Sequence, residues 1–219
     1  MRSLVLKAQS GRKPQQLLCL GAHCDDIDIG CGGTLLKLLE RNPRTQVTWV
    51  VLASDPVRER ELRASARRFL RRAAKATVLV HRFRDGFFPA LYPQIKEVFE
   101  SLKQLPDPDM IFTHHRADFH QDHRIVAELT WNTFRNHLIL EYEIPKYEGG
   151  LLTPSAYVGL TPAQVERKIA ILWQSYKTQR AKRWFTADTF RAMLRLRGLE
   201  AAANSGWAEG FHVSKFLLE

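Results

Sequence analysis

The sequence has no long apolar run and few cysteines. Although 45% of its 219 residues are hydrophobic, no stretch approaches the roughly 20 apolar residues that cross a bilayer as a helix. The charged N-terminus, Met1-Arg2, lacks the apolar core of a secretory signal peptide. The 3 cysteines are odd in number and crowded between Cys19 and Cys31, which is a poor disulfide framework and favours reduced thiols. We therefore expect a cytoplasmic protein without structural disulfides.

Acidic residues are also few relative to basic ones: 23 Asp and Glu stand against 33 Lys and Arg, which gives a formal net charge of +10. Seven arginines lie between Arg58 and Arg72, and a second basic run covers Lys177 to Arg183. This pattern is typical of a solvated helix face. It also fits a field that attracts phosphate-bearing substrates or an anionic membrane surface, which would give a peripheral contact. No RNA- or DNA-binding motif accompanies the basic runs, so nucleic acid is the least favoured partner.

Apolar segments alternate along the chain with segments of helical periodicity. The expected strands are 16–21, 46–53, 76–80, 109–113, 138–144 and 156–160. The expected helices are 33–41, 56–74, 92–105, one that ends near 136, 162–181 and 186–197. Residues 1–15 are predicted to be a loose lead-in, and 211–218 a short apolar tail. The alternation, without repeats or a linker, favours one α/β domain over 1–219, with a mostly parallel sheet and helices on both faces.

The first polar segment directly follows the expected strand 16–21. Residues 20–34 contain one imidazole, three carboxylates and four glycines, and the exit of a strand is where an open α/β sheet builds its ligand site. His23 and Asp26 offer nitrogen and oxygen donors of the kind that bind zinc. The run Gly30-Cys31-Gly32-Gly33 predicts a tight turn under the metal. A phosphate cradle is the alternative, although the spacing does not match the dinucleotide fingerprint.

A second polar segment, residues 113–124, follows the expected strand 109–113. Four of the chain's 8 histidines fall within ten residues here, and both segments can lie at the same carboxyl edge of the sheet. Catalytic zinc takes three protein ligands and keeps one position open for water, whose pKa it lowers towards ~7. His23, Asp26 and His123 would supply these ligands.

Other side chains in the two segments suit the remaining steps of a hydrolysis. Asp25, which is not in the ligand set, is placed to take a proton from the attacking water. His120, three residues before His123, can donate to an oxyanion and a leaving nitrogen. Asp122 can hold an imidazole in one tautomer.

Several polar residues receive a structural interpretation instead. Five histidines are expected to be surface or satisfied core residues: His81, His114, His115, His137 and His212. A substrate contact by His114 or His115 is the lesser alternative. Cys24 as a thiolate ligand is a further alternative, although two histidines and an aspartate already complete the set.

Two motifs resemble those of a known family. The segment Ala22-His23-Cys24-Asp25-Asp26-Ile27-Asp28-Ile29-Gly30-Cys31-Gly32-Gly33-Thr34 resembles Ala-His-Pro-Asp-Asp, an acidic residue and Gly-x-Gly-Gly. That is the opening motif of the PIG-L/LmbE-like family of zinc-dependent N-deacetylases. The segment Asp118-Phe119-His120-Gln121-Asp122-His123-Arg124 is similar to its second motif, His-Pro-Asp-His-Arg. Weaker similarities lie at Arg58-x-x-Glu61, Tyr176-Lys177-Thr178-Gln179 (family His-x-Ser-Gln) and 206–211.

The resemblance implies a Rossmann-like fold and a role for each matched residue. The implied zinc ligands are His23, Asp26 and His123. The implied general base is Asp25, His120 serves the oxyanion, and Arg58 pairs with the catalytic carboxylate. The chain departs from the motifs at four positions, where Cys24 and Gln121 replace prolines, Asp28 replaces a glutamate and Tyr176 replaces a histidine. Loss of the prolines is expected to cost the turns some rigidity.

The predicted function is zinc-dependent removal of an acetyl group from an N-acetylated amino sugar. The sugar is N-acetylglucosamine-like and either free or linked to a nucleotide, a phosphate or a lipid. Fe²⁺ and Co²⁺ are alternative metals, because such a site selects weakly by affinity. One rival is a metal-dependent phosphoesterase that recruits Asp28, Asp118 and Asp122 to a second metal. The other is a non-catalytic module that docks through the basic face.

Overall fold

The computed structural model describes residues 14–217. Most of the predicted lead-in, 1–13, and the last residue of the predicted tail lie outside this range. Within the described part, no helix combines the length and the apolar character needed to cross a membrane.

Seven strands form one sheet with the order β3-β2-β1-β4-β5-β7-β6. Their bounds are β1 Gln16–Gly21, β2 Gln46–Ala53, β3 Lys75–Phe83, β4 Met110–His114, β5 Ile139–Tyr142, β6 Ala156–Gly159 and β7 Ala208–His212. Strands β1 to β5 pair in parallel, whereas β7 runs antiparallel to both β5 and β6. The expected α/β fold with a mostly parallel sheet is confirmed.

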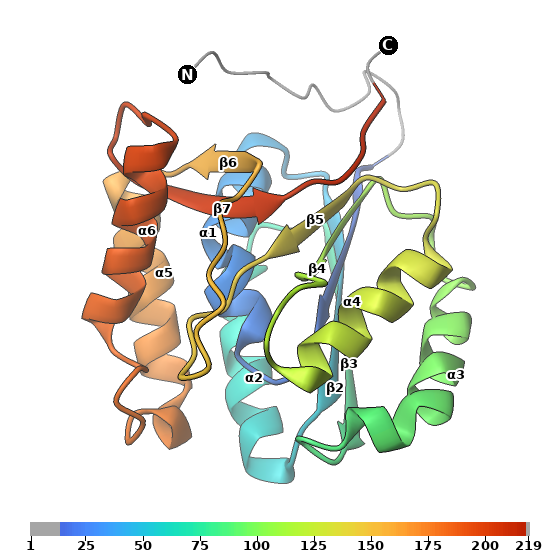
Figure 1. Cartoon of the computed structure of the whole chain (residues 1–219). Helices are drawn as coiled ribbons and strands as arrows, with labels where there is room; N and C mark the ends of the chain where they lie inside the picture. The colour runs from blue at the N-terminus through green and yellow to red at the C-terminus, as the bar shows by residue number, and fades with distance from the viewer. Residues whose placement is uncertain (1–13, 218–219) are drawn as a thin grey trace.

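Helices cover both faces of the sheet (Figure 1). Their bounds are α1 Asp26–Arg41, α2 Pro56–Phe69, α3 Tyr92–Leu102, α4 Gln121–Thr133, α5 Pro162–Ser175 and α6 Ala187–Glu200, with short 3₁₀ turns η1 Phe88–Leu91 and η2 Lys177–Gln179. Alternate residues of each central strand point to opposite faces. Leu17 and Cys19 therefore join the core under α1, α2, α5 and α6, while Leu18 and Leu20 join the core under α3 and α4.

The first helix is longer than predicted, and the prediction of a glycine turn before it is wrong. Helix α1 begins at Asp26 and includes Gly30, Gly32 and Gly33, which have no positive φ. A Cβ at Gly30 would lie 2.2 Å from the Tyr142 ring, and one at Gly32 would lie 2.8 Å from Phe69. The glycines therefore let α1 pack closely on its neighbours, which is a tertiary requirement.

The C-terminal prediction also needs correction. The segment expected to be a tail contributes to strand β7, which lies between β5 and β6 in the sheet. Four helices end earlier than expected: α2 at Phe69, α3 at Leu102, α4 at Thr133 and α5 at Ser175. At Tyr176 the chain leaves α5 and continues as η2.

Candidate metal centre

The site lies where the strand order reverses. Strands β1 and β4 are neighbours in the sheet, and the chain moves away from them in opposite directions, to β2 on one side and β5 on the other. Such a switch point opens a crevice at the carboxyl ends of parallel strands. The polar segments that follow β1 and β4 both begin at this edge of the sheet, so the two halves of the predicted site meet.

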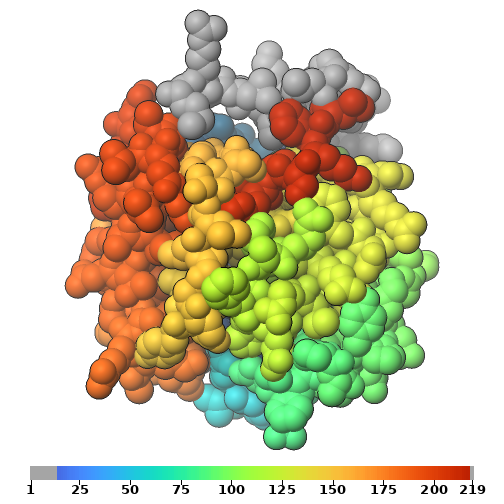
Figure 2. Space-filling view, in the orientation of Figure 1, coloured from blue at the N-terminus to red at the C-terminus, as the bar shows by residue number. Residues whose placement is uncertain are grey.

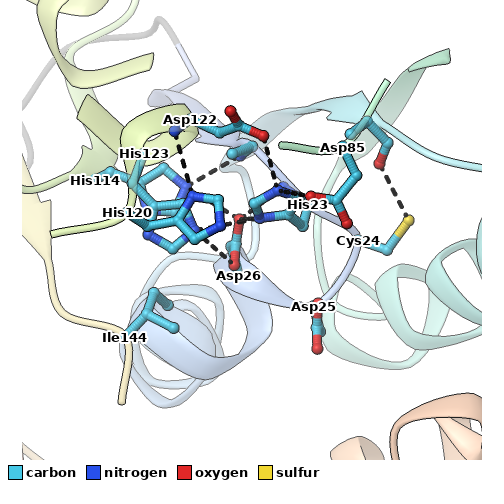
Figure 3. Close-up of polar contacts among 12 residues, drawn as sticks. His23, Cys24, Asp25, Asp26, Asp85, His114, His120, Asp122, His123 and Ile144 are labelled. Carbon is cyan, nitrogen blue, oxygen red and sulfur yellow. Dashed lines mark hydrogen bonds and ion pairs between the residues drawn. The ribbon is translucent and has the colours of Figure 1, made fainter. Parts of the chain in front are cut away.

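The donor atoms of three residues converge at this point (Figure 3). We call these residues, His23, Asp26 and His123, the ligand cluster. His23 Nδ1 lies 3.2 Å from His123 Nε2 and 3.4 Å from Asp26 Oδ2. His123 Nε2 lies 3.6 Å from Asp26 Oδ1. Ligands about 2.1 Å from a tetrahedral zinc lie about 3.4 Å from one another. The donor types and spacing therefore fit a zinc-like ion.

Each imidazole of the ligand cluster has a carboxylate at its other nitrogen. Asp122 Oδ2 lies 3.3 Å from His23 Nε2, and Asp118 Oδ2 lies 3.1 Å from His123 Nδ1. The Asp122 carboxylate is itself fixed by the backbone N–H groups of Gly86, at 2.6 Å, and Phe88, at 3.1 Å. Carboxylates in this position orient metal-binding imidazoles and raise their basicity. Asp122 thus contacts a ligand imidazole, His23, as predicted, and Asp118 makes the equivalent contact with His123.

Asp25 lies in the sequence between His23 and Asp26 of the ligand cluster, and its carboxylate faces Arg58. It is the N-cap of α1, is only 4% exposed, and its Oδ1 accepts a hydrogen bond of 2.9 Å from Arg58 Nη2. Arg58 is in the first turn of α2, where the Asp55 carboxylate accepts the backbone N–H groups of Val57 and Arg58. Burial raises the pKa of Asp25, and Arg58 opposes that rise. The predicted pairing of Arg58 with this carboxylate is present in the geometry.

His120 borders the ligand cluster from the start of α4. Its ring centroid lies 5.0 Å from that of His23 and 4.6 Å from that of His123. As the N-cap of α4, its Nδ1 accepts the backbone N–H of Asp122 at 3.2 Å. In the neutral imidazole the proton must then be on Nε2, so His120 is a hydrogen-bond donor at the edge of the cluster.

Two residues that were not predicted to belong to the site also contact the ligand cluster. His114 is fully buried, stacks on His123 with centroids 3.8 Å apart, and places its Nε2 3.1 Å from Asp26. Asp85, in the turn after β3, lies 2.9 Å from His23 Nε2. The only sequence signal for Asp85 was an Asp-Gly turn at a strand end. For His114 it was proximity to the second motif.

Other candidates lie away from the cluster. The Cys24 thiol donates to Ser54 Oγ at 3.3 Å, and burial raises its pKa to about 11, so the thiolate-ligand alternative is not supported. His115 stacks on His212, with centroids 3.9 Å apart. His137 lies 2.8 Å from the exposed Asp107. Burial raises the pKa of Asp28 to about 8, and its carboxyl faces Ser65 and Tyr176.

The groups of the ligand cluster shift one another's pKa values in both directions, and burial together with the charge of His114 lowers the pKa of His123 to about 3. Burial lowers the pKa of His23, but the carboxylates of Asp26, Asp122 and Asp85 outweigh it and raise that pKa well above its usual value. Burial raises the pKa of Asp26, but the surrounding imidazoles, His123 foremost, hold it well below its usual value. Because the buried carboxylates favour positive charge between them, the field also suits a cation.

The segment between β5 and β6 forms one wall of the site. Figure 2 shows this yellow-to-orange segment lying against the green segment that follows β4. Ile144 is buried beside the imidazoles (Figure 3), and Lys146 donates to Asp118 Oδ2 at 2.7 Å. Arg197 of α6 holds both ends of the wall, because it donates to Glu143 and to the carbonyl oxygen of Leu152. Phe119 and Tyr147 remain 58% and 72% exposed, which leaves apolar surface at the rim.

Comparison with known proteins gives a family match and several structural neighbours. A family model described as PIG-L: GlcNAc-PI de-N-acetylase matches residues 18–134, more than half of the chain and both polar segments. The uncharacterized deacetylase YaiS of Escherichia coli (strain K12) is 28% identical over 150 residues, which cover 62% of this chain and 77% of that protein.

Among solved structures, the conserved protein TT1542 from Thermus thermophilus gives a TM-score of 0.72 at 23% identity, covering 93% of this chain and 96% of that one. The N,N'-diacetylchitobiose deacetylase from Pyrococcus horikoshii gives a TM-score of 0.61 at 19% identity, covering 91% and 83% respectively. At these identities the structural likeness establishes the fold, while the reaction must be argued from the site.

Proposed function

Because this chain belongs to the PIG-L family of de-N-acetylases, we propose that it is a zinc-dependent hydrolase that removes the acetyl group from an N-acetylated amino sugar. The observation that carries the proposal is the ligand cluster, in which the facing nitrogens of His23 and His123 lie 3.2 Å apart and the two oxygens of Asp26 lie 3.4 Å from the first and 3.6 Å from the second. The buried Asp25 carboxylate lies beside them and is not one of the ligands. The N-acetylglucosamine-like substrate follows from the family's description and from the diacetylchitobiose deacetylase that shares the fold.

His23, Asp26 and His123 would hold the ion, which supplies a Lewis acid that polarises the acetyl carbonyl and lowers the pKa of the attacking water. Asp25 accepts the proton of that water as the new C–O bond forms, and returns it to the amide nitrogen as the C–N bond breaks. Arg58 orients Asp25 for this transfer. The Nε2–H of His120 donates to the oxyanion that develops on the acetyl group. Acetate and a free amine are the products.

The phosphoesterase alternative requires carboxylates for a second metal. The three carboxylates considered for it already have partners: Asp118 contacts His123 and Lys146, Asp122 contacts His23, and Asp28 contacts Ser65 and Tyr176. Recruiting them would remove the support of both imidazoles. The binding-module alternative leaves the acid, base and donor residues without a reason to converge. Both are less favoured than amide hydrolysis.

The basic face of α2 suggests the charge of the substrate. Arg63 and Arg67 are exposed on this helix, and Arg71 is exposed in the turn just after it. The first turn of α2 also supplies the partner of Asp25. A positive field beside a site raises the local concentration of anionic substrates. We therefore include a phosphate, nucleotide or lipid pyrophosphate on the sugar in the proposal.

The test is acetate release from a panel of N-acetylated amino sugars, free and phosphate-linked, with and without a chelator. Purified protein should contain close to one zinc per chain, and His23→Ala or His123→Ala should lose it. Full metal content in both variants would contradict the ligand assignment. Asp25→Asn should keep the metal and lose about 10² to 10⁴ in kcat, whereas wild-type turnover would exclude Asp25 as the base. Iron or cobalt in place of zinc would correct the metal and leave the reaction intact.

A further inference from the structure

One of the four departures from the family motifs, Tyr176, contacts two of the others, Cys24 and Asp28. Cys24 and Asp28 lie in the same motif, Tyr176 lies 148 residues after Asp28, and all three are fully buried. The Tyr176 hydroxyl lies 2.7 Å from the carbonyl oxygen of Cys24 and 2.8 Å from Oδ2 of Asp28. The replaced residues therefore form one polar cluster beneath the loop that joins β1 to α1.

The Cys24 carbonyl belongs to the peptide that leads directly into Asp25. The Cys24 side chain is held on the opposite side, where its thiol reaches Ser54 Oγ at 3.3 Å and the carbonyl oxygen of Ala53 at 3.6 Å. Figure 3 shows Cys24 directed away from the ligand cluster and Asp25 below it. Cys24, the residue before Asp25, is thus held both through its backbone carbonyl and through its thiol.

Tyr176 is in turn held by helix α2. It follows α5, and the next turn, η2, is anchored by Glu61, which accepts the Thr178 backbone N–H at 3.0 Å and the Thr178 hydroxyl at 2.6 Å. Arg58, one turn before Glu61 on the same helix, holds the Asp25 carboxylate. Helix α2 therefore supports Asp25 twice, directly through Arg58 and indirectly through Tyr176.

We propose that Tyr176 is a positioning residue for Asp25, and that its hydrogen bond to the Cys24 carbonyl restrains the backbone at residue 24, which a proline restrains in the family motif. A proline restricts the backbone through its ring. Here the carbonyl of residue 24 is fixed by a buried hydrogen bond from Tyr176. In a site closed to water such a bond is both strong and costly to lose. The inference rests on the proposed function, since Asp25 must be the group that needs orienting.

The experiment deletes one oxygen atom and measures turnover and thiol reactivity. Tyr176→Phe should lower kcat about tenfold or more, because small misplacements of a reacting group are costly, while KM and metal content remain unchanged. Cys24→Pro in the Tyr176→Phe background should restore most of the lost kcat. Tyr157→Phe is the matched control: its hydroxyl contacts Glu200 at 3.2 Å, outside the site, and its kcat should equal that of the wild type.

The second readout does not depend on activity. All three cysteines are buried, and alkylation followed by peptide mass mapping reports each thiol separately. Tyr176→Phe should make Cys24 react with N-ethylmaleimide at least about tenfold faster, while Cys19 and Cys31 stay protected because the core is intact. Equal labelling of all three thiols would indicate general destabilisation and overturn the inference. So would a wild-type kcat, a loss confined to KM or metal content, or a failure of Cys24→Pro to restore kcat.

The two proposals fail in different ways. If the wild-type protein releases no acetate from any substrate, the proposed function fails, and selective labelling of Cys24 would still show that Tyr176 fixes this loop. If Asp25→Asn abolishes turnover while Tyr176→Phe changes neither kcat nor labelling, the proposed function stands and the role of Tyr176 is refuted.

Discussion

Replacing Asp118 should weaken metal binding although Asp118 is not one of the three ligands. Its Oδ2 lies 3.1 Å from His123 Nδ1, and its Oδ1 accepts the backbone N–H of His120 at 2.7 Å. The Asp118 and His123 side chains are 3% and 4% exposed, so water cannot replace the lost contact. Lys146, its other partner, retains the Ile144 carbonyl. The change therefore acts mainly on His123.

The magnitude depends on what remains opposite the imidazole. Outer partners of metal ligands are worth about 10- to 100-fold in metal affinity. Asp118→Asn keeps one oxygen acceptor for the Nδ1 proton but loses the charge and the acceptor of the His120 backbone N–H, so we expect about tenfold weaker binding, or about 1.4 kcal/mol. Asp118→Ala also removes the acceptor, so we expect about hundredfold, or about 2.7 kcal/mol.

A competition titration of Zn²⁺ between the protein and a chromogenic chelator measures both values without any substrate. Asp107→Asn is the control, because Asp107 also pairs with a histidine, His137 at 2.8 Å, but is 92% exposed. It removes the same charge and should leave zinc affinity unchanged. Equal affinities for the wild type, Asp118→Asn and Asp118→Ala would refute the assignment of His123 as a ligand supported by Asp118.

Two further predictions test the packing of α1 and the role of the basic face. Gly30→Ala should destabilise the protein by about 2 kcal/mol in urea unfolding despite the helix propensity of alanine, because the new Cβ would lie 2.2 Å from the Tyr142 ring. The loss should shrink in a Tyr142→Leu background, and an equal loss there would revive the turn interpretation. Reversing the charge of Arg63, Arg67 and Arg71 to Glu should raise KM for a phosphate-bearing sugar about tenfold at low salt and leave KM for the uncharged sugar unchanged. An unchanged KM for both sugars would exclude the phosphate proposal.

Local sequence patterns were sufficient for most of the sheet. Strands β1 and β2 have the predicted bounds, because apolar runs that are buried on both faces carry a strong signal. The expected strands at 138–144 and 156–160 are present in shortened form as β5 and β6. Strand β7 was missed because Ala208–His212 has little apolar character of its own and becomes a strand only by pairing with β5 and β6.

The candidate site likewise contains residues that the sequence predicted and residues that only the structure reveals. The residues that bear donor atoms within a motif, such as His23, Asp26 and His123, could be selected from residue type and spacing. Of the residues that support them, Asp122 and Arg58 were also predicted from the motifs, whereas Asp85, Asp118 and Tyr176 were not. Asp85 follows a different strand, and Asp118 had no visible partner until His123 Nδ1 was placed beside it. Tyr176 is 150 residues from Asp26, yet its hydroxyl reaches the loop before Asp25.

The sequence by itself determined the alternation of strands and helices up to α6, the family, and the donor atoms offered to a metal, because these depend on residue type and on neighbours along the chain. The tertiary structure decided where α1 begins, why it contains glycines, which carboxylate supports which imidazole, and what holds Asp25. Those outcomes depend on distances between segments that are remote in sequence, and hydrogen bonds and steric overlap act only when the atoms are brought together.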